Sequence, residues 1–146
     1  MTLHLEDLHE GQRFTTPERI EVNTEEVKAF AAKYDPQPFH LDDAAAEASF
    51  FGGLAASGWH TAAMSMRLIV AAIPFGGGVI GAGGEIRWPR PTRPGDVLQV
   101  ECTVETITPS RSKPDQGIVR MRCETLNQNG ELVQVLPANL LAFRRG

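Results

Sequence analysis

A carboxylate and an imidazole stand five residues apart in the segment Asp35-Pro36-Gln37-Pro38-Phe39-His40. When two such groups come within hydrogen-bonding range of one water molecule, they form an acid/base pair. Each proline disfavours helical geometry at the residue before it, which predicts a stiff, extended turn in which Asp35 and His40 converge on one point. Prolines and a capping aspartate are also ordinary turn chemistry, so the spacing alone fits a turn aspartate beside a surface histidine at least as well.

A second candidate is the pair Ser57-Gly58, at the start of the apolar segment Gly58–Ile73. A helix that is apolar on nearly all sides is a buried helix. The first amides of a helix have no partner within it and lie at the positive end of its dipole. Because a glycine lets an oxygen approach the backbone closely, the Gly58 amide is a candidate donor to a developing oxyanion. The alternative is that Ser57 only caps the helix and that Gly58 only packs.

The element that precedes and positions Asp35 is expected to be a helix from about Thr24 to Tyr34. Its apolar positions recur with the helical period: Val27, Phe30, Ala31 and Tyr34. Asn23 followed by Glu26 has the pattern of a capping box at its start, and Pro36 predicts that it ends at Asp35. A short alanine-rich helix is expected next, over about 42–49.

In the second half of the chain, apolar and polar residues alternate with the period of a strand that has one buried face and one solvent-exposed face. Two such strands are expected over 97–107 and 118–126, and a symmetric hairpin would set Cys102 opposite Cys123. The expected inward positions are Leu98, Val100, Cys102, Val104 and Thr106 in the first strand and Val119, Met121, Cys123 and Thr125 in the second. Further strands are expected over 132–144, over 83–88 and around 14–22.

This order of elements predicts an α+β hot-dog fold, in which an antiparallel sheet wraps around a central buried helix. The helix would be Gly58–Ile73. A chain of 146 residues fits a single domain over 1–146, and a domain of that length buries enough surface to need no cross-links.

Composition and charge narrow the expected function. A net charge of -4 argues against a nucleic-acid-binding protein, which needs a clustered basic surface. Two cysteines are too few for a disulfide framework and have no metal-ligand spacing, and we predict neither a metal nor a cofactor. The sequence shows no secretory signal and no apolar run long enough to span a membrane. A cytoplasmic location is the default expectation.

Together, these motifs resemble the MaoC-like dehydratases, also called (R)-specific enoyl-thioester hydratases. The family signature has the form Asp-x-Asn-Pro-x-His, followed two residues later by an acidic residue and then by a helix that a His-Gly pair opens. The corresponding residues here are Asp35 to His40, Asp42 and Ser57-Gly58. The family's Pro-x-x-x-Gly-Asp turn is matched by the segment 91–96. The resemblance extends over nearly the whole chain.

The resemblance implies an acyl-thioester substrate, carried by coenzyme A or acyl carrier protein, and a homodimer or higher homo-oligomer of hot-dog domains. By the same resemblance, Asp35 and His40 would hold the reacting water. One would take the water proton during attack on the β-carbon, and the other would supply a proton to the α-carbon. The Gly58 amide would stabilise the enolate oxygen at the thioester.

The chain departs from the family pattern at three positions. Gln37 replaces the usual Asn and moves the amide by one methylene, and Ser57 replaces the usual His. The serine that some members carry further along the helix falls at about Met66, next to Ser65. We therefore predict Gln37 and Ser57 as substrate-binding residues in a pocket that differs from the common one.

Other polar side chains allow two interpretations each. His60, just inside the buried helix, is a candidate to bind a polar acyl group, although a buried histidine bonded to backbone is the more frequent case. Three arginines, Arg87, Arg90 and Arg93, are candidates to meet the phosphates of coenzyme A, although charges around a turn are more often simply solvated.

Two other functions fit the same fold. A hot-dog thioesterase commonly uses a carboxylate of the central helix, and the segment 58–73 contains neither Asp nor Glu. A non-catalytic acyl-thioester-binding protein would be expected to lack Asp35 or His40, and both are present. The sequence thus favours a hydratase or dehydratase.

Overall fold

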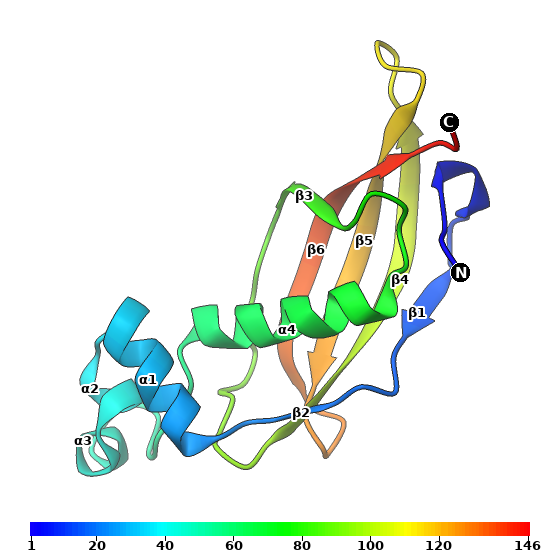
Figure 1. Cartoon of the computed structure of the whole chain (residues 1–146). Helices are drawn as coiled ribbons and strands as arrows, with labels where there is room; N and C mark the ends of the chain where they lie inside the picture. The colour runs from blue at the N-terminus through cyan, green and yellow to red at the C-terminus, as the bar shows by residue number, and fades with distance from the viewer.

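The structure is a curved antiparallel sheet that holds one long helix against its concave face. The computed structural model describes residues 1–146. The helix α4 (Gly58–Ala72) crosses the strands β4 (Val97–Pro109), β5 (Gln116–Leu126) and β6 (Leu132–Phe143), while three short helices gather at its amino-terminal end (Figure 1). This arrangement confirms the predicted α+β hot-dog fold.

The sheet has the strand order β1-β4-β5-β6-β3, in which neighbours are hydrogen-bonded, and β2 also pairs with β4. The shorter strands are β1 (Arg13–Thr15), β2 (Ile20–Glu21) and β3 (Ile80–Gly84). Because β3 is the last strand in this order, one of its edges is unpaired. No helix of the protein is long and apolar enough to cross a membrane.

The core forms between α4 and the inner face of the sheet. Leu68 and Ile69 of α4 are fully or almost fully buried, as are Leu98 and Val100 of β4. Cys102 pairs with Cys123 across β4 and β5, as predicted, and both thiols are free. Thr106 was expected to face inward but is exposed. The register between β4 and β5 shifts between Val104 and Thr106, and an extra residue at such a bulge reverses the faces that follow.

The helix α1 spans Thr24–Tyr34, as predicted, and the Asn23 side chain accepts a hydrogen bond from the Glu26 amide. After it come α2 (Pro38–Leu41) and α3 (Asp43–Glu47). The prediction of an extended turn from Asp35 to His40 was wrong in its second half, because His40 lies in α2. Pro38 is at the first turn of this helix, where the fixed φ angle of proline suits helical geometry and its missing N–H costs nothing.

The strand expected over 83–88 begins earlier in the structure, at Ile80. Beyond Gly84 only Arg87 makes a bridge, to Val135 of β6. Glycine is required at position 84 because a Cβ there would lie 2.5 Å from the Pro137 carbonyl oxygen. Pairing with β6 therefore selects this glycine-rich segment as a strand, although its own residues have low strand propensity.

Candidate active site

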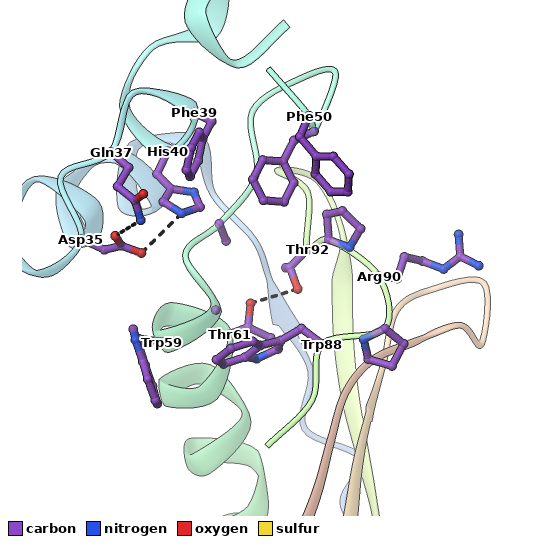
Figure 2. A pocket seen from close by; sticks show the side chains of 15 residues that line it. Asp35, Gln37, Phe39, His40, Phe50, Trp59, Thr61, Trp88, Arg90 and Thr92 are labelled. Atoms are coloured by element: carbon purple, nitrogen blue, oxygen red, sulfur yellow. Dashed lines mark hydrogen bonds and ion pairs between the residues drawn. The ribbon is translucent and has the colours of Figure 1, made fainter. Parts of the chain in front are cut away.

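The junction between α1 and α2 brings Asp35 and His40 together. Asp35 follows the last residue of α1 with a non-helical backbone, and Gln37 is extended, so the chain turns sharply before α2 begins. The Asp35 Oδ2 atom lies 3.4 Å from the His40 Nε2 atom. Figure 2 shows both side chains pointing toward each other at one wall of a cavity. The predicted convergence of the two groups is therefore present in the structure.

A backbone carbonyl fixes the orientation of the His40 ring. His40 is 4% exposed, and its Nδ1 atom lies 2.6 Å from the Ala55 carbonyl oxygen. Because a carbonyl oxygen only accepts hydrogen bonds, Nδ1 must carry a proton here. A neutral His40 therefore has its free lone pair on Nε2, the nitrogen that faces Asp35 and the cavity.

Two donors hold the Asp35 carboxylate in its ionised form. The Ser57 hydroxyl donates to Oδ2 at 2.6 Å, and the Gln37 amide donates to Oδ1 at 2.5 Å. Burial raises the pKa of the Asp35 carboxyl, but these hydrogen bonds and the charge of His40 outweigh that effect and hold the pKa below its ordinary value of 3.8. Hydrogen bonds to a charged form favour that form. Ser57 and Gln37 thus bind Asp35 directly, a role that the sequence did not suggest for either residue.

The start of α4 forms another part of the same cavity. Ser57 is the N-cap, and its hydroxyl accepts a hydrogen bond from the Trp59 amide at 3.2 Å. Gly58, the first helical residue, lines the cavity together with Asp35 and His40. Its N–H has no carbonyl partner within the helix, as for every first-turn amide. A candidate acid/base pair and a candidate oxyanion donor therefore face one space.

Trp88 explains why position 58 must be glycine. A Cβ at Gly58 would lie 2.8 Å from the Trp88 indole. The indole is held from its other side, because its Nε1 donates to the Gln134 side chain at 3.1 Å and Gln134 is 1% exposed. The ring therefore covers the first turn of α4. No sequence pattern indicates this contact, which joins residues 30 positions apart.

The cavity has a volume of about 540 Å³, and most of its other walls are apolar. Phe39 of α2 and the loop residues Phe50 and Phe51 form one side, and Trp59 and Trp88 form another (Figure 2). The polar groups on the wall opposite Asp35 are Thr61 and Thr92. Their hydroxyls are hydrogen-bonded to each other at 3.0 Å. An apolar cavity with a few convergent polar groups is the usual form of a small-molecule site.

His60 does not reach this cavity. Its ring stacks on Phe30 of α1, with centroids 4.6 Å apart and planes 8° apart, and it is 7% exposed. Burial lowers the pKa of His60 below 6.5, against a smaller opposing effect of Glu26, so the ring is neutral. The structure therefore does not support the predicted contact between His60 and the substrate. The period of the helix turns position 60 toward α1 while positions 58 and 61 face the cavity.

Neither candidate for the family's helix serine lies at the cavity that Asp35, His40 and Gly58 line. Ser65 is fully buried, and its hydroxyl lies 2.7 Å from that of Thr125 in β5. Met66 lines a second cavity further along α4. The hydroxyls that line this cavity instead belong to Thr61 and Thr92, and the Ser57 hydroxyl contacts Asp35 at its edge.

The three arginines have separate environments. Arg90 lines the same cavity as Asp35 and His40 and pairs with Glu131 at 3.1 Å. Arg87 pairs through its backbone with Val135. The Arg93 guanidinium donates to the carbonyl oxygens of three loop residues, namely Phe51 at 2.5 Å, Gly53 at 2.8 Å and Leu54 at 3.3 Å. Arg93 thus fixes the loop that carries Phe51 and the Ala55 carbonyl, and its donors are not directed at a ligand phosphate.

Replacement of Arg93 by Met is expected to lower the free energy of unfolding by about 2–4 kcal/mol, because the loop carbonyls lose a charged donor that serves all three. Urea unfolding followed by circular dichroism measures this change. Arg90→Met is the matched control, since Arg90 belongs to the same turn but makes one exposed ion pair, which is worth at most about 1 kcal/mol. Equal losses in the two variants would contradict the assigned role of Arg93.

Comparisons with known proteins show the family of this chain. The model of the MaoC like domain matches residues 7–125. The chain is 30% identical over 129 residues to the uncharacterized protein YdeM of Bacillus subtilis (strain 168), covering 86% of this chain and 89% of YdeM. It is also similar to the crystal structure of a MaoC-like dehydratase from Rhodospirillum rubrum, with 57% identity, a TM-score of 0.96 and 99% of both chains covered.

The chain is also similar to the solved structure of an (R)-hydratase. The unliganded (R)-hydratase PhaJ1 from Pseudomonas aeruginosa is 28% identical, with a TM-score of 0.79 and with 99% of this chain and 88% of that chain covered. The family model covers the segment that contains Asp35, His40 and Gly58 together with the helix and strands that position them. By its sequence and its fold, the chain belongs to the MaoC-like domain family.

Proposed function

We propose that this protein is a hydro-lyase that hydrates a trans-2-enoyl thioester, carried by coenzyme A, to the (R)-3-hydroxyacyl thioester, or catalyses the reverse dehydration. The observation that carries the proposal is the convergence of the Asp35 carboxylate, the His40 Nε2 atom and Gly58 on one apolar cavity. The similarity to the (R)-hydratase PhaJ1 and to the MaoC-like dehydratase of Rhodospirillum rubrum supports the same class of reaction.

In the proposed mechanism, His40 transfers the proton and Asp35 orients the water. The Asp35 carboxylate is a weak base, because the hydrogen bonds from Ser57 and Gln37 lower its pKa. The free lone pair of His40 Nε2 takes one proton from the water as the water oxygen bonds to the β-carbon. The imidazolium, stabilised by Asp35, then returns a proton to the α-carbon.

The thioester oxygen carries negative charge between these two steps. An N–H that is fixed in advance and directed at this oxygen stabilises the charge without reorganisation. The Gly58 amide is at the positive end of α4, and the Trp88 ring beside it keeps water away from the donor. A drier environment strengthens the hydrogen bond to the oxyanion.

The direct test is an assay of the protein with a panel of trans-2-enoyl-CoA thioesters that are linear, branched or dicarboxylic. We expect loss of the conjugated enoyl group, formation of the (R)-3-hydroxyacyl-CoA and no release of free thiol. Release of free thiol would indicate a thioesterase instead. Tight binding of acyl-CoA without any turnover would indicate a non-catalytic binding protein.

Replacement of Ser57 by Ala is expected to raise the pKa of the Asp35 carboxyl, which NMR titration of its carboxyl carbon measures. Without the Ser57 hydroxyl, one of the two hydrogen bonds that lower this pKa is lost, so the pKa rises. Ser57→Thr keeps the hydroxyl and serves as the control.

The free energy of unfolding is also expected to fall in Ser57→Ala. The ionised Asp35 stabilises the fold above about pH 3.8, and this contribution is lost as the pH falls through the lower pKa of the folded state. Ser57→Ala reduces the difference between the two pKa values and removes the N-cap acceptor, which costs about 1 kcal/mol by itself. An unchanged pKa of Asp35 in Ser57→Ala would show that Ser57 does not control the ionisation of Asp35.

We also propose that the protein functions as a homodimer. Three apolar side chains on one side of α4, Trp59, Met66 and Val70, are 60%, 42% and 53% exposed, and Ile80 of the unpaired edge strand β3 is 42% exposed. Large exposed apolar patches of this kind mark interaction sites, and an unpaired strand edge is a ready site for pairing with a second copy. Sedimentation velocity of the purified protein tests this proposal.

A further inference from the structure

We propose that the hydroxyl pair of Thr61 and Thr92 is a binding site for an uncharged oxygen atom in the acyl group of the substrate, such as an ether, keto or hydroxyl oxygen. This inference rests on the proposed function, since it concerns the substrate of the same site. It assigns the two threonines to recognition of the acyl group, and they take no part in the acid/base chemistry.

The two threonines come from different parts of the chain. Thr61 belongs to α4, and Thr92 belongs to the loop that joins β3 to β4. Both residues are 2% exposed, and both line the cavity that contains Asp35 and His40. Figure 2 shows their hydroxyls pointing toward each other, away from the Asp35 carboxylate. The fold therefore places a buried polar pair at a cavity whose other walls are largely apolar.

The hydrogen bonds of the pair leave one proton without an acceptor. The Thr61 hydroxyl donates to the Thr92 hydroxyl at 3.0 Å, with the Ser57 carbonyl as a longer second acceptor at 3.4 Å. A hydroxyl has one proton and two lone pairs, so Thr92 uses a lone pair for this bond and keeps its own proton. The Thr92 hydroxyl makes no other hydrogen bond. Thr61 thus orients Thr92 as a free donor to the cavity.

Other contacts already hold the loop in place. The Thr92 carbonyl accepts a hydrogen bond from the Ala56 amide at 2.9 Å, which joins the loop to the segment before α4. The Asp96 carboxylate accepts from the Arg93 amide at 2.8 Å and fixes the turn that follows. A valine of the same shape would pack at position 92 without a buried donor, which is costly when no acceptor is present. The hydroxyl of Thr92 therefore indicates a ligand that supplies an acceptor oxygen.

The position of the pair points to the acyl group and not to the coenzyme A arm. The arm has to leave the cavity for solvent, past exposed lining residues such as Phe50 and Arg90. Thr61 lies three residues after Gly58 in the same helix, a rise of about 4.5 Å, which an extended chain covers in roughly four bonds. With the thioester oxygen at the Gly58 amide, the pair meets an atom about four bonds beyond the thioester carbon.

The charges around the cavity favour a neutral oxygen over a carboxylate. The Asp35 carboxylate lies at the same cavity and would repel a second negative charge. The nearby arginines have other partners, since Arg90 pairs with Glu131 at 3.1 Å and Arg93 donates to carbonyls of the loop. A carboxylate bound at the pair would be desolvated without a cation, which is strongly unfavourable.

The test compares the binding of two saturated acyl-CoAs that share the same length and the same carrier. The acyl group of 4-methoxybutanoyl-CoA has an ether oxygen four bonds from the thioester carbon, where hexanoyl-CoA has a methylene. Calorimetry gives both dissociation constants, and the ratio of the hexanoyl value to the methoxybutanoyl value isolates the oxygen. In Thr92→Val this ratio should fall about threefold to tenfold, the range for one net hydrogen bond. Hexanoyl-CoA should bind Thr92→Val about as tightly as the wild type.

Further variants and one further ligand serve as controls. Thr92→Ser keeps the hydroxyl and should keep the wild-type ratio, whereas Thr92→Ala removes it and should lower the ratio as Thr92→Val does. Ser65→Ala removes another buried hydroxyl of α4, but Ser65 contacts Thr125 and does not line this cavity, so the ratio should not change. Glutaryl-CoA, which has a carboxylate in place of the ether, should bind the wild type at least about tenfold more weakly than 4-methoxybutanoyl-CoA.

The outcomes separate this proposal from the proposed function. An unchanged ratio in Thr92→Val and Thr92→Ala would overturn the proposal. Equal losses for both ligands, in variants that keep the wild-type thermal midpoint, would also overturn it, because the hydroxyl would then serve the carrier arm. Glutaryl-CoA binding as tight as that of the ether would overturn the preference for an uncharged oxygen.

The hydration assay is independent of these ratios. A wild type that hydrates no enoyl-CoA but shows the expected ratios would overturn the reaction and leave the binding site in place. Hydration of an enoyl-CoA together with an unchanged ratio would overturn only the binding site, and failure of the wild type to bind any of the three acyl-CoAs would overturn both.

Discussion

Asp35→Asn is expected to lower kcat/KM for a trans-2-enoyl-CoA by about 1,000-fold to 10,000-fold. In the wild type, the Asp35 carboxylate accepts hydrogen bonds from Ser57 and Gln37 and faces the His40 Nε2 atom at 3.4 Å. An asparagine amide at this position would direct an N–H at Nε2 and occupy the lone pair that takes the water proton. It would also remove the negative charge that stabilises the imidazolium.

Asp42→Asn is the matched control for Asp35→Asn. Asp42 is an exposed carboxylate near the site, and it accepts a hydrogen bond from the Ala45 amide as the N-cap of α3. Asparagine is an equally good N-cap, so both activity and thermal midpoint should be unchanged. If Asp35→Asn kept more than about a tenth of the wild-type activity, well outside the range for loss of an acid/base group, the proposed mechanism would be wrong.

His40→Gln is expected to reduce kcat by about 1,000-fold, with a much smaller change in KM, because the lost imidazole acts in the transition state and contributes little to ground-state binding. Glutamine retains an N–H donor for the Ala55 carbonyl, which would otherwise be left unpaired near the buried ring. Steady-state kinetics measure the effect, and circular dichroism with thermal unfolding confirms that the fold is intact.

The double variant Asp35→Asn/His40→Gln provides the sharper comparison. When two residues act as one unit, the losses of activity from their replacement are strongly non-additive. The kcat/KM of the double variant should therefore be about as low as that of the less active single variant. Losses that multiply would show that Asp35 and His40 contribute independently. That result would contradict a mechanism in which both groups act on one water molecule.

Local sequence patterns were sufficient to predict the elements that position the site. The period of α1, the cap at Asn23, the apolar run of α4 and the alternation of β4 and β5 each depend on residues close together in the chain. Burial of one face is what creates these patterns, so they can be recognised without knowledge of the partner surface. The pairing of Cys102 with Cys123 followed from the symmetry of a hairpin.

Predictions failed where a distant segment decides the local structure. The strand at Ile80–Gly84 exists because β6 pairs with it, and α2 begins at Pro38 although both prolines suggested an extended turn. His60 has the right position in the sequence for a substrate contact, but the packing of α4 on α1 turns it onto Phe30. The strand and the orientation of His60 each depend on a neighbour that is remote in the chain, whereas α2 begins at Pro38 because proline suits the first turn of a helix.

The sequence by itself determined the fold class, the proximity of Asp35 and His40, and the place of Gly58 at the start of a buried helix, because each depends on the spacing of residues close together in the chain. Only the tertiary structure showed how these groups are tuned. The Ala55 carbonyl sets the tautomer of His40, Ser57 lowers the pKa of Asp35, and Trp88 covers Gly58. These contacts join residues 15 to 30 positions apart. The local pattern of residue types does not show which of these side chains the folded chain brings within hydrogen-bonding distance.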